Sequence, residues 1–149
     1  MYFNDLKVGM TVEIPPAVIE KQRMMDFARA YDNIPLHTDE EYAKASPFGQ
    51  LIAPGVMSFM SVWVKYLEVD FFGKELLAGK STRIEWHKPV YADDILRGKA
   101  AITNLSPRSA RNGIVEVTIE VFNQHGVHVL SNVTEAIVCC REQTDNNAK

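Results

Sequence analysis

Residues 55–66 form a stretch that is apolar on nearly every side of a helix. Its hydrophobic members are Val56, Met57, Phe59, Met60, Val62, Trp63, Val64 and Tyr66. At 3.6 residues per turn they leave little polar surface, and such a helix has to be covered on most of its sides. The remainder of the chain is short of other long helices. We therefore predict a curved β-sheet that folds around this one helix.

The second half of the chain supplies strands for that sheet. In residues 114–122 valine and isoleucine alternate with polar residues, which is the two-residue period of a strand with one buried face. Strand patterns cover residues 11–19, 80–90, 95–105, 114–122 and 127–138, and turn-forming residues occupy 106–113 and 123–126. The two prolines of the first pattern suit an edge strand or an extended lead-in. We predict an α+β domain whose later strands form an antiparallel meander around a long central helix.

Composition limits what such a domain can do. With 149 residues, of which 46% are hydrophobic, the chain suits one soluble domain over residues 1–140, followed by a disordered tail at 141–149. The net charge of −3 argues against nucleic-acid binding. Neither a signal peptide nor a membrane span is evident, so we expect no membrane association and a cytoplasmic location. The adjacent Cys139 and Cys140 are expected to be reduced and structural.

A carboxylate and an imidazole flank a proline in residues 31–39. Upstream, the stripe of Met24, Phe27, Ala28 and Tyr31 predicts the buried face of an amphipathic helix over residues 20–31. Pro35 makes the preceding Ile34 extended, so the helix should end near Asp32 and His37 should lie on an irregular turn. Thr38 and Glu41 have the spacing of a capping box that begins a short helix over residues 39–44.

Two interpretations of this pair are open. An imidazole titrates near neutrality, and a carboxylate beside it can orient it and accept a proton, so Asp32 and His37 suit an acid/base dyad that shares one water molecule. Alternatively, Asp32 is a turn residue that bonds nearby backbone amides, and His37 is a partly buried side chain with one satisfied nitrogen.

Gly55 stands at the beginning of the apolar helix, after the turn-rich residues 46–54. Backbone amides at a helix N-terminus point outward with the positive end of the helix dipole, which suits an oxygen that gains negative charge. Ser58 and Ser61 interrupt the apolar surface. They either reach a substrate or bond back to a carbonyl one turn earlier.

These residues resemble the signature of the MaoC-like dehydratases and (R)-specific enoyl-CoA hydratases, whose fold is the hotdog. The family pattern is Asp-x-Asn-Pro-x-His, followed some twenty residues later by His-Gly or Ser-Gly at the start of the central helix. Asp32, Pro35, His37 and Gly55 fall on it. Ile34 stands where the pattern has Asn, with an Asn one place earlier. Pro54 precedes the glycine in place of His or Ser, and the resemblance extends over about residues 3–140.

The resemblance implies a hotdog fold and reversible hydration of a 2-enoyl thioester to a 3-hydroxyacyl thioester. Asp32 and His37 would be the catalytic residues and the Gly55 amide the oxyanion donor, with Ile34, Pro54 and Ser58 near the substrate. It implies an acyl-CoA or acyl-carrier-protein thioester as partner, and a homodimer or higher oligomer whose sheets pair edge to edge. We expect no cofactor beyond the CoA of the substrate.

No metal site is expected, because His87, His125 and His128 lack partners at ligand spacing. A hotdog thioesterase and a non-catalytic acyl-thioester-binding protein are the alternatives to a hydratase.

Overall fold

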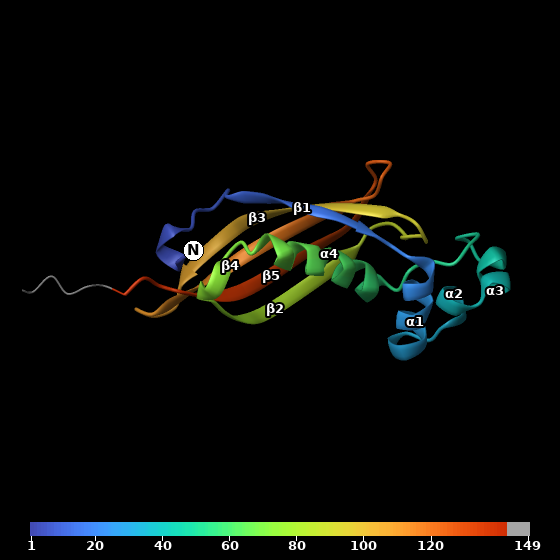
Figure 1. The fold of residues 1–149 in the computed structure, drawn as a ribbon, viewed down its shortest axis with the longest axis horizontal. Helices are drawn as coiled ribbons and strands as arrows, with labels where there is room; N and C mark the ends of the chain where they lie inside the picture. The colour runs from blue at the N-terminus through green and yellow to red at the C-terminus, as the bar shows by residue number, and fades with distance from the viewer. Residues whose placement is uncertain (143–149) are drawn as a thin grey trace, which may run out of the picture.

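The computed structural model describes residues 1–142, so most of the expected tail, residues 143–149, lies outside the described residues. Its elements are η1 (Phe3–Asp5), β1 (Thr11–Val18), α1 (Lys21–Tyr31), α2 (Pro35–Thr38), α3 (Glu40–Ala45), α4 (Gly55–Val69), η2 (Gly73–Glu75), β2 (Leu76–Trp86), β3 (Ile95–Pro107), β4 (Asn112–Phe122) and β5 (His128–Cys139) (Figure 1). Arg141 donates hydrogen bonds to Asn4 and Asp5 and so holds the end of the described chain against η1.

The five strands form one antiparallel sheet in the order β1-β3-β4-β5-β2. The predicted α+β hotdog architecture is confirmed, but the meander contains only β3, β4 and β5. The preceding strand, β2, lies at the far edge beside β5, with Trp86 opposite Leu130. Alternating hydrophobicity marks strands and says nothing about which strands are neighbours. That order follows from how the whole sheet packs around α4.

The strand β1 forms the other edge of the sheet, as its two prolines led us to expect. Its pairing with β3 is regular from Thr11 to Ile14 and resumes at Ala17 after a shift in register. The interruption falls on the two prolines, which cannot donate ladder hydrogen bonds. An edge position tolerates this loss because only one side of the strand is paired.

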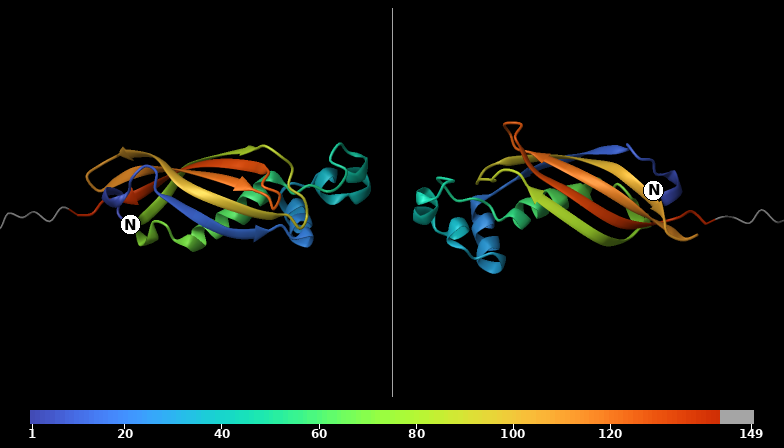
Figure 2. Two further views of the ribbon diagram at one scale, coloured as in Figure 1. Left: turned by 90° about the horizontal axis from the view of Figure 1, so that it is seen from above. Right: turned by 180° about the vertical axis from the view of Figure 1, so that it is seen from behind.

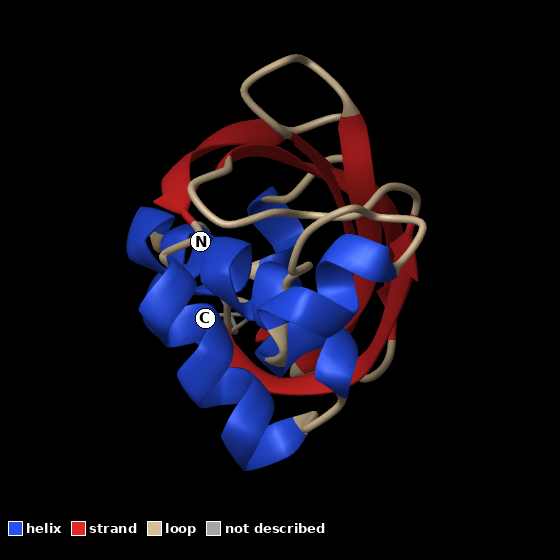
Figure 3. Ribbon diagram, turned by 90° about the vertical axis from the view of Figure 1, so that its right-hand side faces the viewer, coloured by secondary structure: helices blue, strands red, loops and turns tan. Residues whose placement is uncertain are grey.

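The long helix α4 lies along one face of the sheet (Figure 2), and a view along the molecule shows the strands as a curved layer on one side of the helices (Figure 3). Its side chains Phe59, Val62 and Tyr66 are buried in the core. The prediction that the helix is covered on most of its sides is wrong for this single chain. A stripe of four residues, which we call the α4 stripe, is about half exposed: Val56, Met60, Val64 and Leu67.

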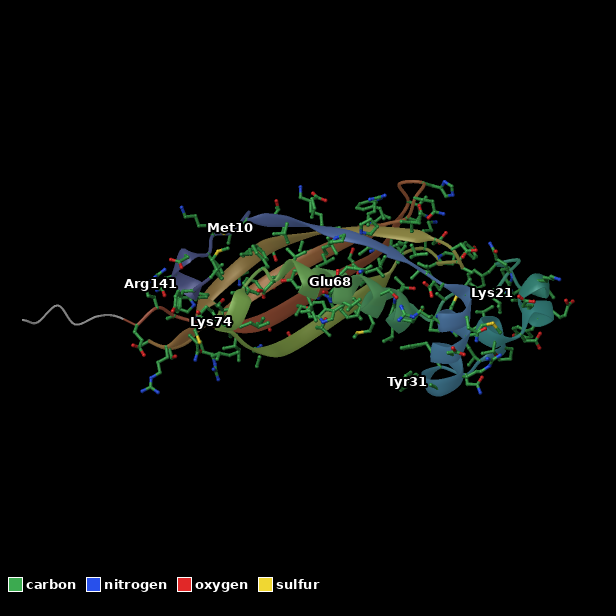
Figure 4. All side chains as sticks on the ribbon, in the orientation of Figure 1. Met10, Lys21, Tyr31, Glu68, Lys74 and Arg141 are labelled. Carbon is green, nitrogen blue, oxygen red and sulfur yellow. The ribbon has the colours of Figure 1, made fainter. Side chains whose placement is uncertain are left out.

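The three short helices α1, α2 and α3 form a cap beyond one end of the sheet (Figure 1). Met24 and Ala28 bury the inner face of α1, as expected. Tyr31 does not, because it lies at the free end of the helix (Figure 4) with 79% of its surface exposed and its ring 5.0 Å from that of Phe27. Among the described residues, no helix has both the length and the apolarity needed to cross a membrane.

Candidate active site

Asp32 ends α1, where its backbone amide donates the last helical hydrogen bond to the carbonyl of Ala28. Ile34 is extended, with φ −116° and ψ 151°, as a residue before proline should be. The predicted helix end is therefore confirmed. Within residues 1–142 the Asp32 carboxylate accepts no hydrogen bond from a backbone amide, and 47% of this side chain is exposed.

His37 lies on α2, a single helical turn, and not on the irregular turn that we predicted. Pro35 is the first residue of that turn. Its fixed φ is suited to a helix start, where the missing N–H is not needed. The Thr38 hydroxyl donates to the carbonyl of Ile34 at 3.1 Å and so ties the turn together. The imidazole that this turn presents is buried.

The hydrogen bonds of His37 fix its tautomer. Nδ1 lies 2.7 Å from the carbonyl oxygen of Ile52, and because a carbonyl only accepts, Nδ1 carries the proton. In the neutral ring Nε2 then has a free lone pair. This atom lies 3.3 Å from Oδ2 of Asp32. A water molecule that donates one hydrogen to each of these two acceptors would keep its own lone pairs free to attack a carbon atom.

The helix α3 that follows begins one residue later than the predicted capping box. Asp39 is its N-cap, and its carboxylate accepts from the backbone amide of Tyr42 at 3.1 Å. Thr38 cannot play this part because its hydroxyl is already bonded within α2. The predicted cap at Thr38 is therefore wrong by one residue, and Asp39 takes its place.

The N-terminus of α4 lacks a side-chain cap. Pro54 occupies the N-cap position and makes no capping bond, and the first bond within the helix runs from the Ser58 amide to the Pro54 carbonyl at 3.1 Å. The amides of Gly55, Val56 and Met57 therefore have no acceptor inside the helix. They form a set of donors at the positive end of the helix dipole.

A cleft of about 420 Å³ brings these parts together. It is lined by Asp32, His37, Phe48, Ile52, Ala53, Gly55, Val56, Ser58, Trp86, His87, Lys88, Pro89 and Val90. Of the residues predicted from the sequence, Asp32, His37, Gly55 and Ser58 are in this lining. Ile34 and Pro54 are not: the first precedes α2 and the second precedes α4.

The serine hydroxyls of α4 bond back to the helix, the second of the two alternatives. Ser61 donates to the carbonyl of Met57 at 2.8 Å, and Ser58 donates to that of Pro54 at 3.4 Å. Ser58 is buried and still lines the cleft, but its proton is directed at the backbone.

Trp86 is the residue of the cleft that sequence reasoning missed. It ends β2, and its indole lies on Gly55: a Cβ built there would stand 2.4 Å from Cε2 and 2.5 Å from Nε1 of the ring. No side chain fits in that space, which explains the glycine. Its partner lies thirty-one residues away in the sequence, a tertiary contact without a local signal.

The remaining histidines and cysteines make other contacts. On the sheet His128 Nε2 lies 2.6 Å from Glu120 Oε2, and His87 Nε2 lies 2.8 Å from the Ser131 hydroxyl. Cys139 and Cys140 are free thiols. In the part of the chain that the structure describes, no three His, Cys, Asp or Glu residues are placed to hold a metal ion.

Comparison with known proteins identifies the family of the chain. Residues 7–132 match the family described as FAS1-like, dehydratase domain region. A 3-hydroxybutyryl-CoA dehydratase of Methylorubrum extorquens is 30% identical over 112 residues, which are 74% of this chain and 69% of that protein.

Two solved structures share nearly the whole fold. A MaoC-like dehydratase from Rhodospirillum rubrum has a TM-score of 0.81 at 26% identity, over 96% of this chain and 99% of that one. A monoamine oxidase regulatory protein from an Archaeoglobus species has a TM-score of 0.90 at 25% identity, over 95% and 96%.

Proposed function

The chain belongs to the FAS1-like dehydratase-region family of MaoC-like proteins, and on that premise we propose that it adds water reversibly across the 2,3 double bond of a 2-enoyl thioester. The product is a 3-hydroxyacyl thioester. One observation carries this proposal: Asp32 Oδ2 and His37 Nε2 lie 3.3 Å apart in the same cleft as the open N-terminus of α4.

Each group has one step in the reaction. Asp32 and the unprotonated Nε2 of His37 each accept a hydrogen bond from one water molecule, whose oxygen attacks C3. One of the two acceptors takes one proton, and the other hydrogen stays on the new hydroxyl group. As the C3–O bond forms, the π electrons of the double bond move toward the thioester oxygen, where the Gly55 amide stabilises the negative charge. The proton taken from water is then delivered to C2, so that H and OH are added and the dyad returns to its starting state.

The substrate class follows from the proposed chemistry. A thioester gives the enolate that the Gly55 amide can stabilise, and its carrier is CoA or an acyl carrier protein. The CoA ester is the first to test because the Methylorubrum relative is named for one. A non-catalytic acyl-thioester-binding protein is the second candidate, since Ile34 and Pro54 depart from the family signature. A cytoplasmic location stays a prediction of the sequence.

A second copy of the chain is the partner that the open side of α4 fits. The α4 stripe leaves four large apolar side chains about half exposed, and the neighbouring edge strand β2 has an unpaired row of backbone groups. Leu76 and Leu77 add exposed apolar surface on that strand. Pairing of two β2 edges would satisfy those backbone groups, and contact of the α4 stripe with a second copy would cover its apolar side chains. Both features support the expected homodimer.

The test is a panel of short, medium and branched 2-enoyl-CoA esters, in which loss of the conjugated thioester absorbance is followed. Asp32→Asn and His37→Ala should each lower the rate ~10²–10⁴-fold, because each removes one acid/base group. Asp26→Asn on the surface of α1 and His125→Ala in an exposed turn are matched controls that should retain full activity.

The product decides among the candidates. A chirally pure 3-hydroxyacyl-CoA supports the hydratase, and release of free CoA thiol supports a thioesterase. Binding of the esters without turnover at every chain length would leave a binding protein. Full activity of both dyad variants would contradict the mechanism itself.

A further inference from the structure

We propose that Trp86 is a second oxyanion donor, whose indole N–H binds the thioester oxygen together with the backbone amide of Gly55. The inference rests on the proposed function and adds a catalytic residue to it. Trp86 lines the same cleft as Asp32 and His37.

The indole of Trp86 lies directly beside the start of α4. Trp86 is the last residue of β2, and its ring packs directly on the first residue of α4. Atoms closer than 3.0 Å to an ideal Cβ are essentially never found, and here three atoms of one indole violate that limit at Gly55. The chain therefore uses glycine to let the ring reach the backbone at this point.

The indole nitrogen of Trp86 lies at the N-terminal end of α4. In an α-helix each Cα–Cβ bond is tilted toward the N-terminus. At the first residue of a helix, a Cβ would thus stand at the N-terminal mouth, on the side to which the first-turn amides point. The Trp86 Nε1 atom lies 2.5 Å from that position at Gly55. The indole nitrogen and the Gly55 amide consequently lie at the same mouth.

The indole N–H of Trp86 is available to donate a hydrogen bond. An indole nitrogen donates and never accepts, and within residues 1–142 that of Trp86 has no hydrogen-bond acceptor. Half of the Trp86 surface, 51%, is exposed, and the residue lines the cleft. The hydroxyl of Ser58, which also lines the cleft, already donates to the Pro54 carbonyl. Trp86 thus offers a free donor where Ser58 does not.

Two donors suit the charge that develops. The thioester oxygen becomes enolate-like as water adds, and a donor placed where charge appears stabilises the transition state more than the ground state. Loss of one such donor typically costs ~10²–10³-fold in kcat. If Trp86 only packed against ligands in the cleft, its replacement would instead weaken the binding of every ligand, with or without a carbonyl.

The experiment compares Trp86→Phe with Trp63→Phe. Phenylalanine keeps an aromatic ring against Gly55 and removes the N–H. Trp63 is the matched control, because its indole packs between Phe59 and Tyr66 on α4, outside the lining of the cleft. We expect kcat on the enoyl-CoA panel to fall ~10²-fold in Trp86→Phe with little change in KM, and to be unchanged in Trp63→Phe.

A binding assay supplies a readout that a packing role would not change. Butyryl-CoA has the carbonyl, and S-butyl-CoA, the thioether, lacks it. Trp86→Phe should weaken butyryl-CoA by no more than the small change in KM and should leave S-butyl-CoA unchanged. It should also reduce the red shift of the absorbance of a bound enoyl thioester. If the Phe variant does not fold, replacing Trp86 by 3-benzothienylalanine removes the N–H from a ring of nearly the same shape.

The outcomes separate the two proposals. Wild-type turnover with an unaffected Trp86→Phe, or equal weakening of thioester and thioether, overturns the role of Trp86 alone. Binding of thioesters without turnover overturns the proposed hydration, while the carbonyl-specific loss still decides whether Trp86 donates. A wild type that neither binds nor turns over these esters overturns both.

Discussion

One added methyl group at residue 55 should destabilise the protein although it improves helix propensity. Gly→Ala inside a helix stabilises by up to ~1 kcal/mol. At Gly55, however, the new Cβ would stand 2.4–2.9 Å from three atoms of the Trp86 ring. Overpacking of this kind costs ~1–3 kcal/mol. Because the overlap outweighs the propensity, we expect Gly55→Ala to lose ~1–2 kcal/mol of unfolding free energy.

The control and the partner variant make this prediction specific. A Cβ at Gly79, in β2, would meet no atom within 4 Å, so Gly79→Ala should be neutral or stabilise by up to ~1 kcal/mol. In a Trp86→Ala background the overlap is gone, and Gly55→Ala should cost nothing. The cycle should therefore give a coupling free energy of ~1–2 kcal/mol between residues 55 and 86.

The assay is equilibrium unfolding in urea at one fixed protein concentration, since an oligomer would make the midpoint concentration-dependent. Turnover of enoyl-CoA is measured on the same samples. The reasoning is refuted if Gly55→Ala is as stable as the wild type, or if its loss persists undiminished when Trp86 is alanine. Either result would mean that the indole does not restrict residue 55.

Two further predictions concern α4. Burial raises the pKa of Tyr66 to about 12, so one tyrosine should ionise last in an absorbance titration. This pKa is above the unfolded value of ~10, so the associated stability is present below pH ~10 and is lost as pH rises toward 12, a loss that Tyr66→Phe should abolish. Met60→Glu, in the α4 stripe, should convert the expected dimer to a monomer in sedimentation, whereas Val8→Glu, at an exposed turn, should not. A monomeric wild type would contradict this assignment of the stripe.

Local patterns predicted those parts of the fold that depend on a few neighbouring residues. The end of α1 at Asp32 followed from Pro35, and the start of α4 at Gly55 followed from the apolar run after a turn-rich segment. The edge position of β1 followed from its prolines. Each of these signals acts within one or two turns of the chain.

Features that depend on distant partners were not predictable in this way. The placement of β2 beside β5, and of Trp86 on Gly55, depends on how the whole sheet packs around α4. The apolar surface of the helix over residues 55–66 was predicted, but not that the sheet of one chain leaves the α4 stripe half exposed. A hydrophobic pattern indicates that a surface is buried, but it does not indicate whether the same chain or another copy buries it.

The helices α3 and α4 differ in their N-caps: a side chain caps α3, and none caps α4. α3 has only six residues, and the Asp39 carboxylate satisfies one of its first amides. α4 has fifteen residues and begins after Pro54, which has no side-chain acceptor. A cap there would contribute ~1 kcal/mol, but it would occupy an amide of the helix turn whose residues Gly55 and Val56 line the same cleft as Asp32 and His37. Burial of Val62 and Tyr66 stabilises α4 without a cap. The backbone amides of its first turn therefore keep the ability to donate to the oxygen of a ligand.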